Sequence, residues 1–398
     1  MRRILLLAAT VVFVDTIFFA ALTPLLPHYA HALGLGKTGA GVLAAAYPAG
    51  SFVGAVPSGV VAARAGVKRT VLVGLTAVAV CIVLFGVGDR AWELDVARFV
   101  QGVASAFSWT GALAWLVAAA PAGRRGELIG TAFAAAVGGA LFGPVLGGVA
   151  TVAGTGWTFG VVGVASLGLV AFAATTPSST PEEPQPLRKL VAAFGDRRLL
   201  GGFWFVVLPA LLFGVLDVLA PLRLARLGLS GVAIGAVFLA AAALEAGNNI
   251  VVGRASDRRG TARPIIAGLA ASAAVAALLP WPARAALLVP VVVVSGIAFG
   301  TFFTPGMTLL ANVSEERGLD YGYTFAIVGL AWAPGAALGA SGGGALAHAA
   351  GDAVPYLALS VTCALTLGGA WLSRGSTAWT TPSAKASSSS SSPTTDAA

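Results

Sequence analysis

The chain has 398 residues, of which 57% are hydrophobic and only 10% are charged. Soluble domains carry about 25% charged residues, so this composition excludes a water-soluble globular protein and indicates an all-α protein that crosses a membrane several times. The net charge of +8 does not indicate a nucleic-acid partner, because the basic residues lie in short loops between apolar segments.

The chain begins with Met1-Arg2-Arg3 and continues as an apolar run through Asp15 to Pro27. Since no small-residue cleavage site follows this run, we interpret it as a membrane-spanning helix rather than a signal peptide. A spanning helix needs about 20 apolar residues, and twelve such segments follow one another. They lie at 4–31, 38–62, 70–88, 94–119, 127–152, 156–174, 200–225, 231–253, 263–281, 285–312, 320–347 and 353–373.

A polar stretch with four prolines separates the sixth span from the seventh. We therefore predict four regions, with a short surface helix near 187–194 in the second. They are an N-terminal six-helix bundle (1–175), a cytoplasmic linker (176–198), a C-terminal six-helix bundle (199–374) and a disordered, serine-rich tail (375–398).

The two predicted bundles share an internal repeat. Pro27 and Pro221 are 194 positions apart, and the same offset separates Gly59 from Gly253 and Gly102 from Gly296. One offset shared by several helices predicts two pseudo-symmetric halves, with a site at their interface near the middle of the membrane.

Most of the 24 lysines and arginines fall on one side of the twelve predicted spans, the side of the N-terminus. Because short cytoplasmic loops are enriched in basic residues, we expect both termini in the cytoplasm and a multi-pass protein of the cell (inner) membrane.

The turns after the second and eighth spans resemble each other. They read GVVAARAGVKR from Gly59 and GRASDRRGTAR from Gly253, and both resemble the G-x-x-x-D-R-x-G-R-R turn of the major facilitator superfamily. The resemblance covers nearly the whole chain except the tail, and it implies a secondary transporter whose two bundles rock about a central cavity. In that family the turn closes the cytoplasmic side, which assigns a conformational latch to Gly59, Arg64, Gly66, Arg69, Gly253, Asp257, Arg258, Gly260 and Arg263.

The first of these turns departs from the family pattern. Ala63 stands where the signature has aspartate, so only Asp257 supplies a carboxylate. An aspartate at a helix end can accept hydrogen bonds from free amide groups, and arginines can pair with acids. We therefore expect Asp257→Asn to impair transport far more than Ala63→Asp alters it. The alternative interpretation of the basic turns is that they only set the topology.

The fifth span carries glycines at four-residue spacing around a proline. Gly139, Gly143 and Gly147 share one helix face, which lets another helix pack closely, and Pro144 permits a kink. With Gly148, this run resembles the signature of exporters among the drug–proton antiporters of the superfamily. The alternative is an ordinary packing face, and Pro334-Gly335 with Gly339 in the eleventh span fits that alternative.

Four ionisable residues lie within the predicted spans. Asp15 is near the middle of the first span, Arg98 is in the fourth with Gln101 one turn away, and Asp217 and Glu245 are in the seventh and eighth. Such residues are rare in membranes and mark ion or proton pathways. We hypothesise that Asp15 or Glu245 exchanges a proton and that Arg98 biases its protonation, with Asp217 as a further candidate; buried structural polar pairs are the alternative.

Aromatic residues fall on spans that line the cavity in the resembled fold. Phe19, Trp109, Phe299 and Phe303, together with Gln101, suit a lipophilic or aromatic cargo. The alternative for each ring is packing or contact with lipid.

The sequence contains no nucleophile–base pair and no metal-ligand spacing, and Cys81 and Cys363 lie alone in separate spans. We therefore expect no enzyme activity, no cofactor and no metal. The function implied by the resemblance is proton-coupled export of small lipophilic or drug-like molecules by alternating access, by a monomer in the lipid bilayer. A proton-coupled uptake symporter and a non-transporting membrane sensor or scaffold are the alternatives.

Overall fold

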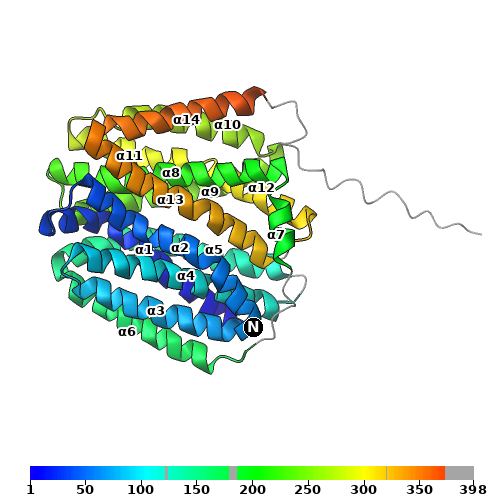
Figure 1. The fold of residues 1–398 in the computed structure, drawn as a ribbon. Helices are drawn as coiled ribbons and strands as arrows, with labels where there is room; N and C mark the ends of the chain where they lie inside the picture. Colours follow the sequence, from blue (N-terminus) through cyan, green and yellow to red (C-terminus); the bar gives the residue numbers. More distant parts are fainter. Residues whose placement is uncertain (122–123, 179–185, 320, 373–398) are drawn as a thin grey trace, which may run out of the picture.

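The computed structural model describes residues 1–121, 124–178, 186–319 and 321–372, and within these ranges it contains helices and turns but no strand (Figure 1). The predicted serine-rich tail lies outside the described residues. The helices are α1 Arg2–Ala32, α2 Lys37–Ala65, α3 Val67–Val87, α4 Ala91–Ala119, α5 Arg125–Ala153, α6 Thr155–Thr175, α7 Leu187–Ala193, α8 Arg197–Arg226, α9 Gly231–Arg259, α10 Ala262–Leu278, α11 Ala285–Gly300, α12 Phe303–Glu316, α13 Tyr321–Ala350 and α14 Ala353–Leu372.

Among the described residues, eleven segments are long and apolar enough to cross a membrane, and α11 and α12 together form one of them. The apolar helix α10 has 17 residues. At 1.5 Å per residue it is about 26 Å long, slightly shorter than a hydrocarbon core of about 30 Å. With α10 included, the predicted all-α membrane fold of twelve spans in two six-helix bundles is confirmed.

The tenth span differs from the prediction of one continuous helix over 285–312. It consists of α11 and α12, which are separated at Thr301 and Phe302. Pro305 has no amide hydrogen, and in a continuous helix its ring would clash with the carbonyl group of Thr301. The helix therefore stops and starts again at this point.

The predicted surface helix of the linker is confirmed as α7. It lies at the same end of the molecule as the N-terminus (Figure 1). We call this end the linker end and the opposite end, where α1 ends and α2 begins, the distal end.

The glycine face of α5 packs against α1. A Cβ atom added at Gly139 would lie 2.7 Å from the carbonyl oxygen of Phe13, and one at Gly143 would lie 2.8 Å from that of Ile17. Gly147 likewise meets the backbone of Ala21. Because a side chain at these positions would push the two helices apart, the predicted close packing is confirmed, and its partner is α1.

The helix α13 repeats this arrangement against α8. Gly335, Gly339 and Gly343 follow the three α5 glycines by 196 positions each. A Cβ atom at Gly335 would lie 2.6 Å from the carbonyl oxygen of Val207, one at Gly339 would meet the backbone of Leu211, and one at Gly343 would meet the side chain of Val215. Figure 1 shows α13 beside α8. The internal repeat is therefore also a repeat of helix packing.

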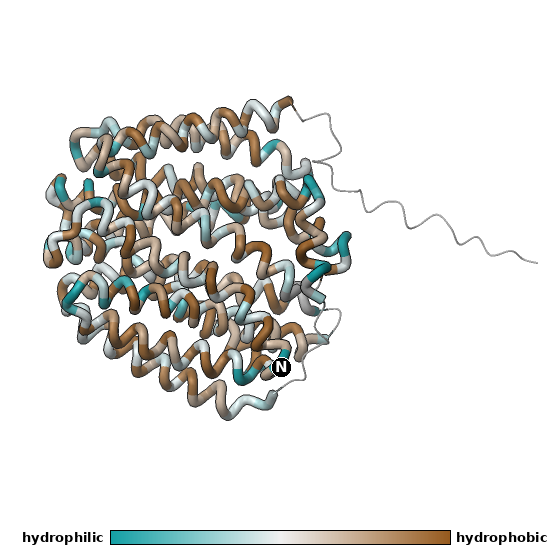
Figure 2. The backbone as a smooth tube through the Cα atoms, viewed as in Figure 1, coloured by the Kyte–Doolittle hydropathy of each residue, from teal (hydrophilic) through white to brown (hydrophobic). Residues whose placement is uncertain are grey.

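Hydropathy is distributed as a bilayer requires. Figure 2 shows hydrophobic residues along the lengths of the helices and hydrophilic ones mainly near the helix ends. Large apolar side chains face outward from the bundles, such as Val152, Trp157 and Leu365, which are at least 72% exposed. In water this surface would be unfavourable, whereas acyl chains solvate it.

Candidate functional site

Asp15 lies inside the N-terminal half, where one of its oxygens accepts three hydrogen bonds. Its Oδ2 is 2.5 Å from the Tyr47 hydroxyl, 2.6 Å from the Ser105 hydroxyl and 2.8 Å from Nε1 of Trp109. The residue is only 2% exposed. Ser105 and Trp109 are four positions apart and so share one face of α4. We call Asp15, Tyr47, Ser105 and Trp109 the Asp15 cluster.

Two glycines bring α2 and α4 together at this cluster. A Cβ atom on Gly102 would meet the backbone of Tyr47, and one on Gly50 would meet the backbone of Phe99. This close crossing places the Tyr47 hydroxyl oxygen 2.7 Å from that of Ser105, so the two hydroxyls lie side by side where they donate to Oδ2 of Asp15. The predicted repeat glycine Gly102 therefore helps to build the site.

Arg98 is buried among aromatic rings and has no carboxylate within ion-pair distance in the described part of the chain. Its guanidinium carbon lies 5.2 Å from the ring centre of Tyr47 and 5.5 to 5.8 Å from those of Phe18, Phe19 and Phe85. Its Nη1 donates to Oε1 of Gln101 at 3.0 Å, as the one-turn spacing predicts. Tyr47 thus contacts both Arg98 with its ring and Asp15 with its hydroxyl.

Several polar atoms of this region are buried without a protein partner. They are Oδ1 of Asp15, Nε of Arg98 and Nε2 of Gln101. Buried polar atoms are nearly always hydrogen-bonded in folded proteins. An unpartnered carboxyl oxygen within the membrane can carry a proton or bind a water molecule. Oδ1 of Asp15 is therefore the oxygen that can take up a proton, because Oδ2 already accepts three hydrogen bonds.

Asp217 and Glu245 lie in the C-terminal half, away from the Asp15 cluster. Asp217 lies on α8, and Glu245 lies on the following helix, α9. A Cβ atom on Gly300 would meet the Glu245 side chain at 2.7 Å, which places Glu245 against the break between α11 and α12. The structure therefore separates the four predicted ionisable residues into one group in each half.

Amide and hydroxyl side chains surround Glu245 at this break. Nδ2 of Asn248 donates to Oγ1 of Thr301 at 2.8 Å, and the hydroxyl of Thr304 donates to Oδ1 of Asn249 at 3.1 Å. The interrupted helix thus gives the C-terminal half a polar region within the membrane, where irregular backbone is tolerated only in protein surroundings.

Aromatic rings from the two halves meet beside the Asp15 cluster. Phe19 packs against Tyr47 at 4.9 Å and against Trp332 of α13 at 5.5 Å between ring centres. Trp109 contacts Phe133 of α5. Phe133 in turn stacks on Phe325 of α13 at 5.4 Å. Phe19 and Trp109, both predicted cavity residues, therefore border the interface between the halves.

The other two predicted cavity aromatics lie within the C-terminal half. Phe299 is fully buried and packs on Phe213, with ring centres 5.7 Å apart. Phe303 is half-buried against the apolar cluster that includes Leu309 and Leu310. The burial of Phe299 favours a packing role in this conformation.

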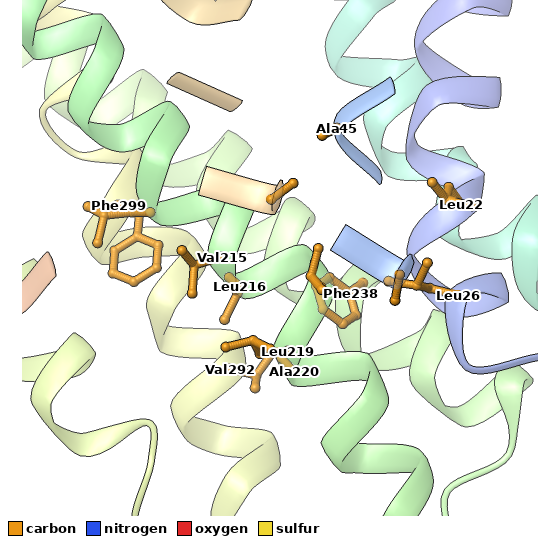
Figure 3. Close-up of a cluster of buried hydrophobic side chains, with 14 of the residues drawn as sticks. Leu22, Leu26, Ala45, Val215, Leu216, Leu219, Ala220, Phe238, Val292 and Phe299 are labelled. Carbon is orange, nitrogen blue, oxygen red and sulfur yellow. The ribbon is translucent and has the colours of Figure 1, made fainter. Parts of the chain in front are cut away.

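An apolar core joins the two halves beyond these aromatic rings. It includes Leu22 and Leu26 of α1, Leu216 and Leu219 of α8 and Phe238 of α9. Figure 3 shows these side chains directed into one region between helices of both halves. With at most 8% exposure in the whole cluster, it leaves little water-accessible space there.

Two glycine-lined crossings hold the halves together at the distal end. A Cβ atom on Gly235 of α9 would lie 2.5 Å from the carbonyl oxygen of Pro144 in α5, and Gly148 meets the same region of α9. In the equivalent crossing, a Cβ atom on Gly41 of α2 would lie 2.5 Å from the carbonyl oxygen of Ala340 in α13. The predicted α5 motif therefore contacts both α1 and the opposite half.

The predicted latch turns are solvent-exposed at the linker end. Gly66 and Gly260 join consecutive helices with φ of +87° and +81°, a backbone conformation that favours glycine. Gly59 and Gly253 have nothing within 4 Å of an added Cβ atom. The four basic latch residues whose side chains the structure describes are exposed, namely Arg64, Arg69, Arg258 and Arg263. The side chain of Asp257 lies outside the described residues.

Tyr47 and Ser105 are the site residues that sequence reasoning missed. A hydroxyl in an apolar span is common, because serine and tyrosine also pack or bond to their own helix. The spacing of Ser105 and Trp109 is a usable signal only once Asp15 is known to face them.

Comparisons with known proteins agree with this arrangement. The family model of the Major Facilitator Superfamily matches residues 8–336. An MFS-type transporter, ppzB, of Metarhizium rileyi is 35% identical over 105 residues, which cover 26% of this chain and 22% of that protein. The chain therefore matches less than a quarter of the length of this relative.

Solved structures share the fold at low sequence identity. A bacterial homologue of the human lysosomal transporter Spinster, in an inward-facing and unoccupied conformation, has a TM-score of 0.75 with 15% identity over 93% of this chain and 96% of that chain. A D-xylose–proton symporter has a TM-score of 0.71 with 16% identity, over 92% and 96%. With the family model matching across most of its length, this multi-pass membrane protein belongs to the Major Facilitator Superfamily.

Proposed function

We propose that the protein exports small lipophilic or drug-like molecules in exchange for protons, as a monomer in the cell (inner) membrane with both termini in the cytoplasm. The observation that carries this proposal is the Asp15 cluster. A carboxyl group held within a membrane, with one oxygen bonded three times and the other free, is costly to bury and suited to exchanging a proton.

The proton is taken up at an acidic group within the membrane. Asp15 is our first candidate, and Glu245 with its neighbour Asp217 is the second. Arg98 acts on Asp15 through Tyr47, since the tyrosine ring faces the guanidinium group and its hydroxyl bonds to the carboxylate. Loss of the Asp15 charge on protonation weakens the bonds to Oδ2, which are stronger for a carboxylate than for a neutral acid.

The cargo binds at the aromatic interface between the halves. Phe19, Trp109, Trp332 and the stacked pair Phe133–Phe325 offer ring faces from both halves. Such rings bind apolar and aromatic molecules and stabilise cations that lie over their faces. Because Trp109 also donates to Asp15, a cargo that displaces the indole alters the environment of the proton site, which couples the two events.

Transport follows alternating access between two states, each of which is closed at one end of the molecule and open at the other. In the present state the glycine crossings and the apolar core hold the distal end together, and the latch turns at the linker end are exposed. With the N-terminus in the cytoplasm, the distal end faces outward. When the distal end opens, the latch turns engage at the linker end, with Asp257 supplying the carboxylate that Ala63 lacks.

Export is favoured over uptake by the glycine run of α5, which resembles the exporter signature. The test uses inside-out membrane vesicles with an imposed, acid-inside proton gradient. Candidate lipophilic compounds are added, and dissipation of the gradient is followed by a pH-sensitive dye. We expect wild type to dissipate it and Asp15→Asn to be inactive, while the exposed loop variant Asp89→Asn remains active.

Other results would overturn the proposal. Dissipation that needs cargo on the opposite face of the membrane would indicate a symporter. Full coupled activity in Asp15→Asn and in Glu245→Gln, with normal folding of both, would exclude these groups as proton sites.

A further inference from the structure

Three charged residues meet at the distal end. Lys37 is the first residue of α2, Arg226 is the last of α8, and Asp352 lies in the turn between α13 and α14. Nζ of Lys37 lies 2.5 Å from Oδ1 of Asp352, and Nη2 of Arg226 lies 2.8 Å from Oδ2. We call these residues the distal ion triad.

The triad connects the two halves of the protein. Lys37 belongs to the N-terminal half, whereas Asp352 and Arg226 belong to the C-terminal half. Among the ion pairs between residues that the structure describes, Lys37–Asp352 is the one that joins the halves. Lys37 also donates to the carbonyl oxygen of Ala347, near the end of α13, at 3.1 Å.

Partial shielding from water distinguishes this pair from ordinary surface ion pairs. The side chains of Lys37 and Asp352 are 29% and 18% exposed. Burial opposes ionisation of Asp352, but the hydrogen bonds and charges of Lys37 and Arg226 outweigh it and lower the pKa of this carboxyl group. Asp352 is therefore ionised at neutral pH and bonded to two cations.

The triad has no counterpart in the other glycine crossing. Lys37 begins the α2–α13 crossing, and the residue 194 positions further on is Gly231, at the start of the α5–α9 crossing. The added Cβ atom of Gly231 would contact the side chain of Thr151. The α5–α9 crossing thus has a glycine at the position where the α2–α13 crossing has Lys37 and its charge pair.

We propose that the distal ion triad is a switchable lock on the distal end, in which Asp352 pairs with two cations when this end is closed and with one cation when it is open. In the closed state Asp352 binds both Lys37 and Arg226. When the halves separate at this end, Lys37 leaves with the N-terminal half. Arg226 stays with Asp352, because both belong to the C-terminal half.

The physical role of Arg226 follows from this geometry. A partly buried carboxylate that loses its only cation is strongly destabilised. Arg226 keeps Asp352 paired in the open state. The open state is therefore less unfavourable, relative to the closed state, than it would be if Lys37 were the only cation bound to Asp352. Lys37 therefore favours closure, and Arg226 favours opening, although both bind the same carboxylate. This inference goes beyond the transport function and holds for either direction of transport.

The experiment measures conformation without any cargo. Spin labels are placed on cysteines that replace Trp157 of the N-terminal half and Trp281 of the C-terminal half, both exposed at the distal end. The buried Cys81 and Cys363 are replaced by alanine. Pulsed electron–electron double resonance on the full chain in lipid nanodiscs then gives the distribution of distances between the two labels. From it we take the ratio of wide (open) to narrow (closed) distances at the distal end.

We expect Lys37→Gln to raise the wide-to-narrow ratio about fivefold, the upper end of what exposed ion pairs give. Asp352→Asn should raise it as well, and Lys37→Gln should have a clearly smaller effect in the Asp352→Asn background, where only its hydrogen bond to Ala347 remains to be lost. Arg226→Gln should lower the ratio. The control Arg90→Gln, which removes an exposed distal charge from the N-terminal half, should leave it unchanged.

Two results would overturn the lock. One is an unchanged ratio in Lys37→Gln, and the other is an additive effect of the two substitutions in the double variant. A rise of the ratio in Arg226→Gln would overturn the assigned role of Arg226. None of these outcomes depends on proton coupling or export, so failure of the lock and failure of the proposed transport function are distinguishable.

Discussion

The Tyr47 hydroxyl donates a hydrogen bond of 2.5 Å to Oδ2 of Asp15, across 32 positions of sequence and between two different helices. The ring of the same tyrosine lies 5.2 Å from the guanidinium carbon of Arg98. Tyr47 is thus the physical link between a buried acid and a buried base that form no ion pair with each other. It makes the interaction of Asp15 with Arg98 dependent on the position of α2.

Removal of the Tyr47 hydroxyl should weaken proton coupling. Tyr47→Phe keeps the ring over Arg98 but removes a donor to a charged acceptor, an interaction that contributes about 1.5–3 kcal/mol. We expect gradient-driven transport to fall on the order of tenfold or more, since 1.4 kcal/mol corresponds to a factor of ten. The measurement is the initial rate of proton-driven transport in vesicles. Ser108→Ala, on α4 but bonded only to the Ser105 carbonyl, is the control, and equal rates in both variants would contradict the assignment.

A methyl group on the glycine face of α5 should destabilise the N-terminal half. In Gly143→Ala the new Cβ atom would overlap α1 near Ile17 and Ala20, and overpacking of this kind costs about 1–3 kcal/mol. Thermal unfolding in detergent measures the loss. Gly130→Ala is matched in helix and in chemistry but has open space around it, so it should be neutral or slightly stabilising. Similar losses in both variants would mean that helix propensity, rather than packing, sets the effect.

Two phenylalanines predicted to line the cavity should behave differently. Phe19 borders the interface between the halves, so Phe19→Ala should raise the KM for a lipophilic cargo severalfold with little loss of stability. Phe299 is fully buried, so Phe299→Ala should destabilise the fold by about 3–5 kcal/mol. Transport kinetics and thermal unfolding of both variants test this contrast. A raised KM with unchanged stability in Phe299→Ala would instead place that ring at the cargo site.

Asp196 should stabilise the start of α8 over a defined pH range. The hydrogen bond from Arg317 lowers the pKa of the Asp196 carboxyl group, which also accepts from the amide of Arg198 at 2.8 Å. Since the folded-state pKa is lowered, this stabilisation is fully present above the ordinary aspartate value of about 3.9 and is lost as the pH falls through the lowered pKa.

We therefore expect Asp196→Ala to cost about 1 kcal/mol at pH 7, a typical loss for a helix cap. Unfolding of both proteins from pH 7 to pH 3 tests the sign. The difference between wild type and variant should stay constant down to about pH 4 and shrink below it. A difference that grows on acidification would contradict the assigned direction of the shift.

The sequence by itself determined the class of fold and much of its order along the chain. The number of spans follows from hydropathy, since the bilayer imposes a minimum length on each apolar segment. The offset of 194 positions shared by several helices predicted two related halves. Asp15 and Arg98 stood out for the same reason, because charge within an apolar span is rare. The four-residue spacing of the α5 glycines predicted a close helix contact without identifying the partner.

Only the tertiary structure decided which of these residues meet. The donors to Asp15 come from two other helices, and the Lys37–Asp352 pair joins residues 315 positions apart. The physical reason is that a membrane helix is apolar on its lipid face and on its protein face, so hydropathy does not show which side chains face a neighbour. The helix break at Thr301 depends on both. Pro305 gives its cause in the sequence, but only the packed structure shows that Glu245 lies against the break.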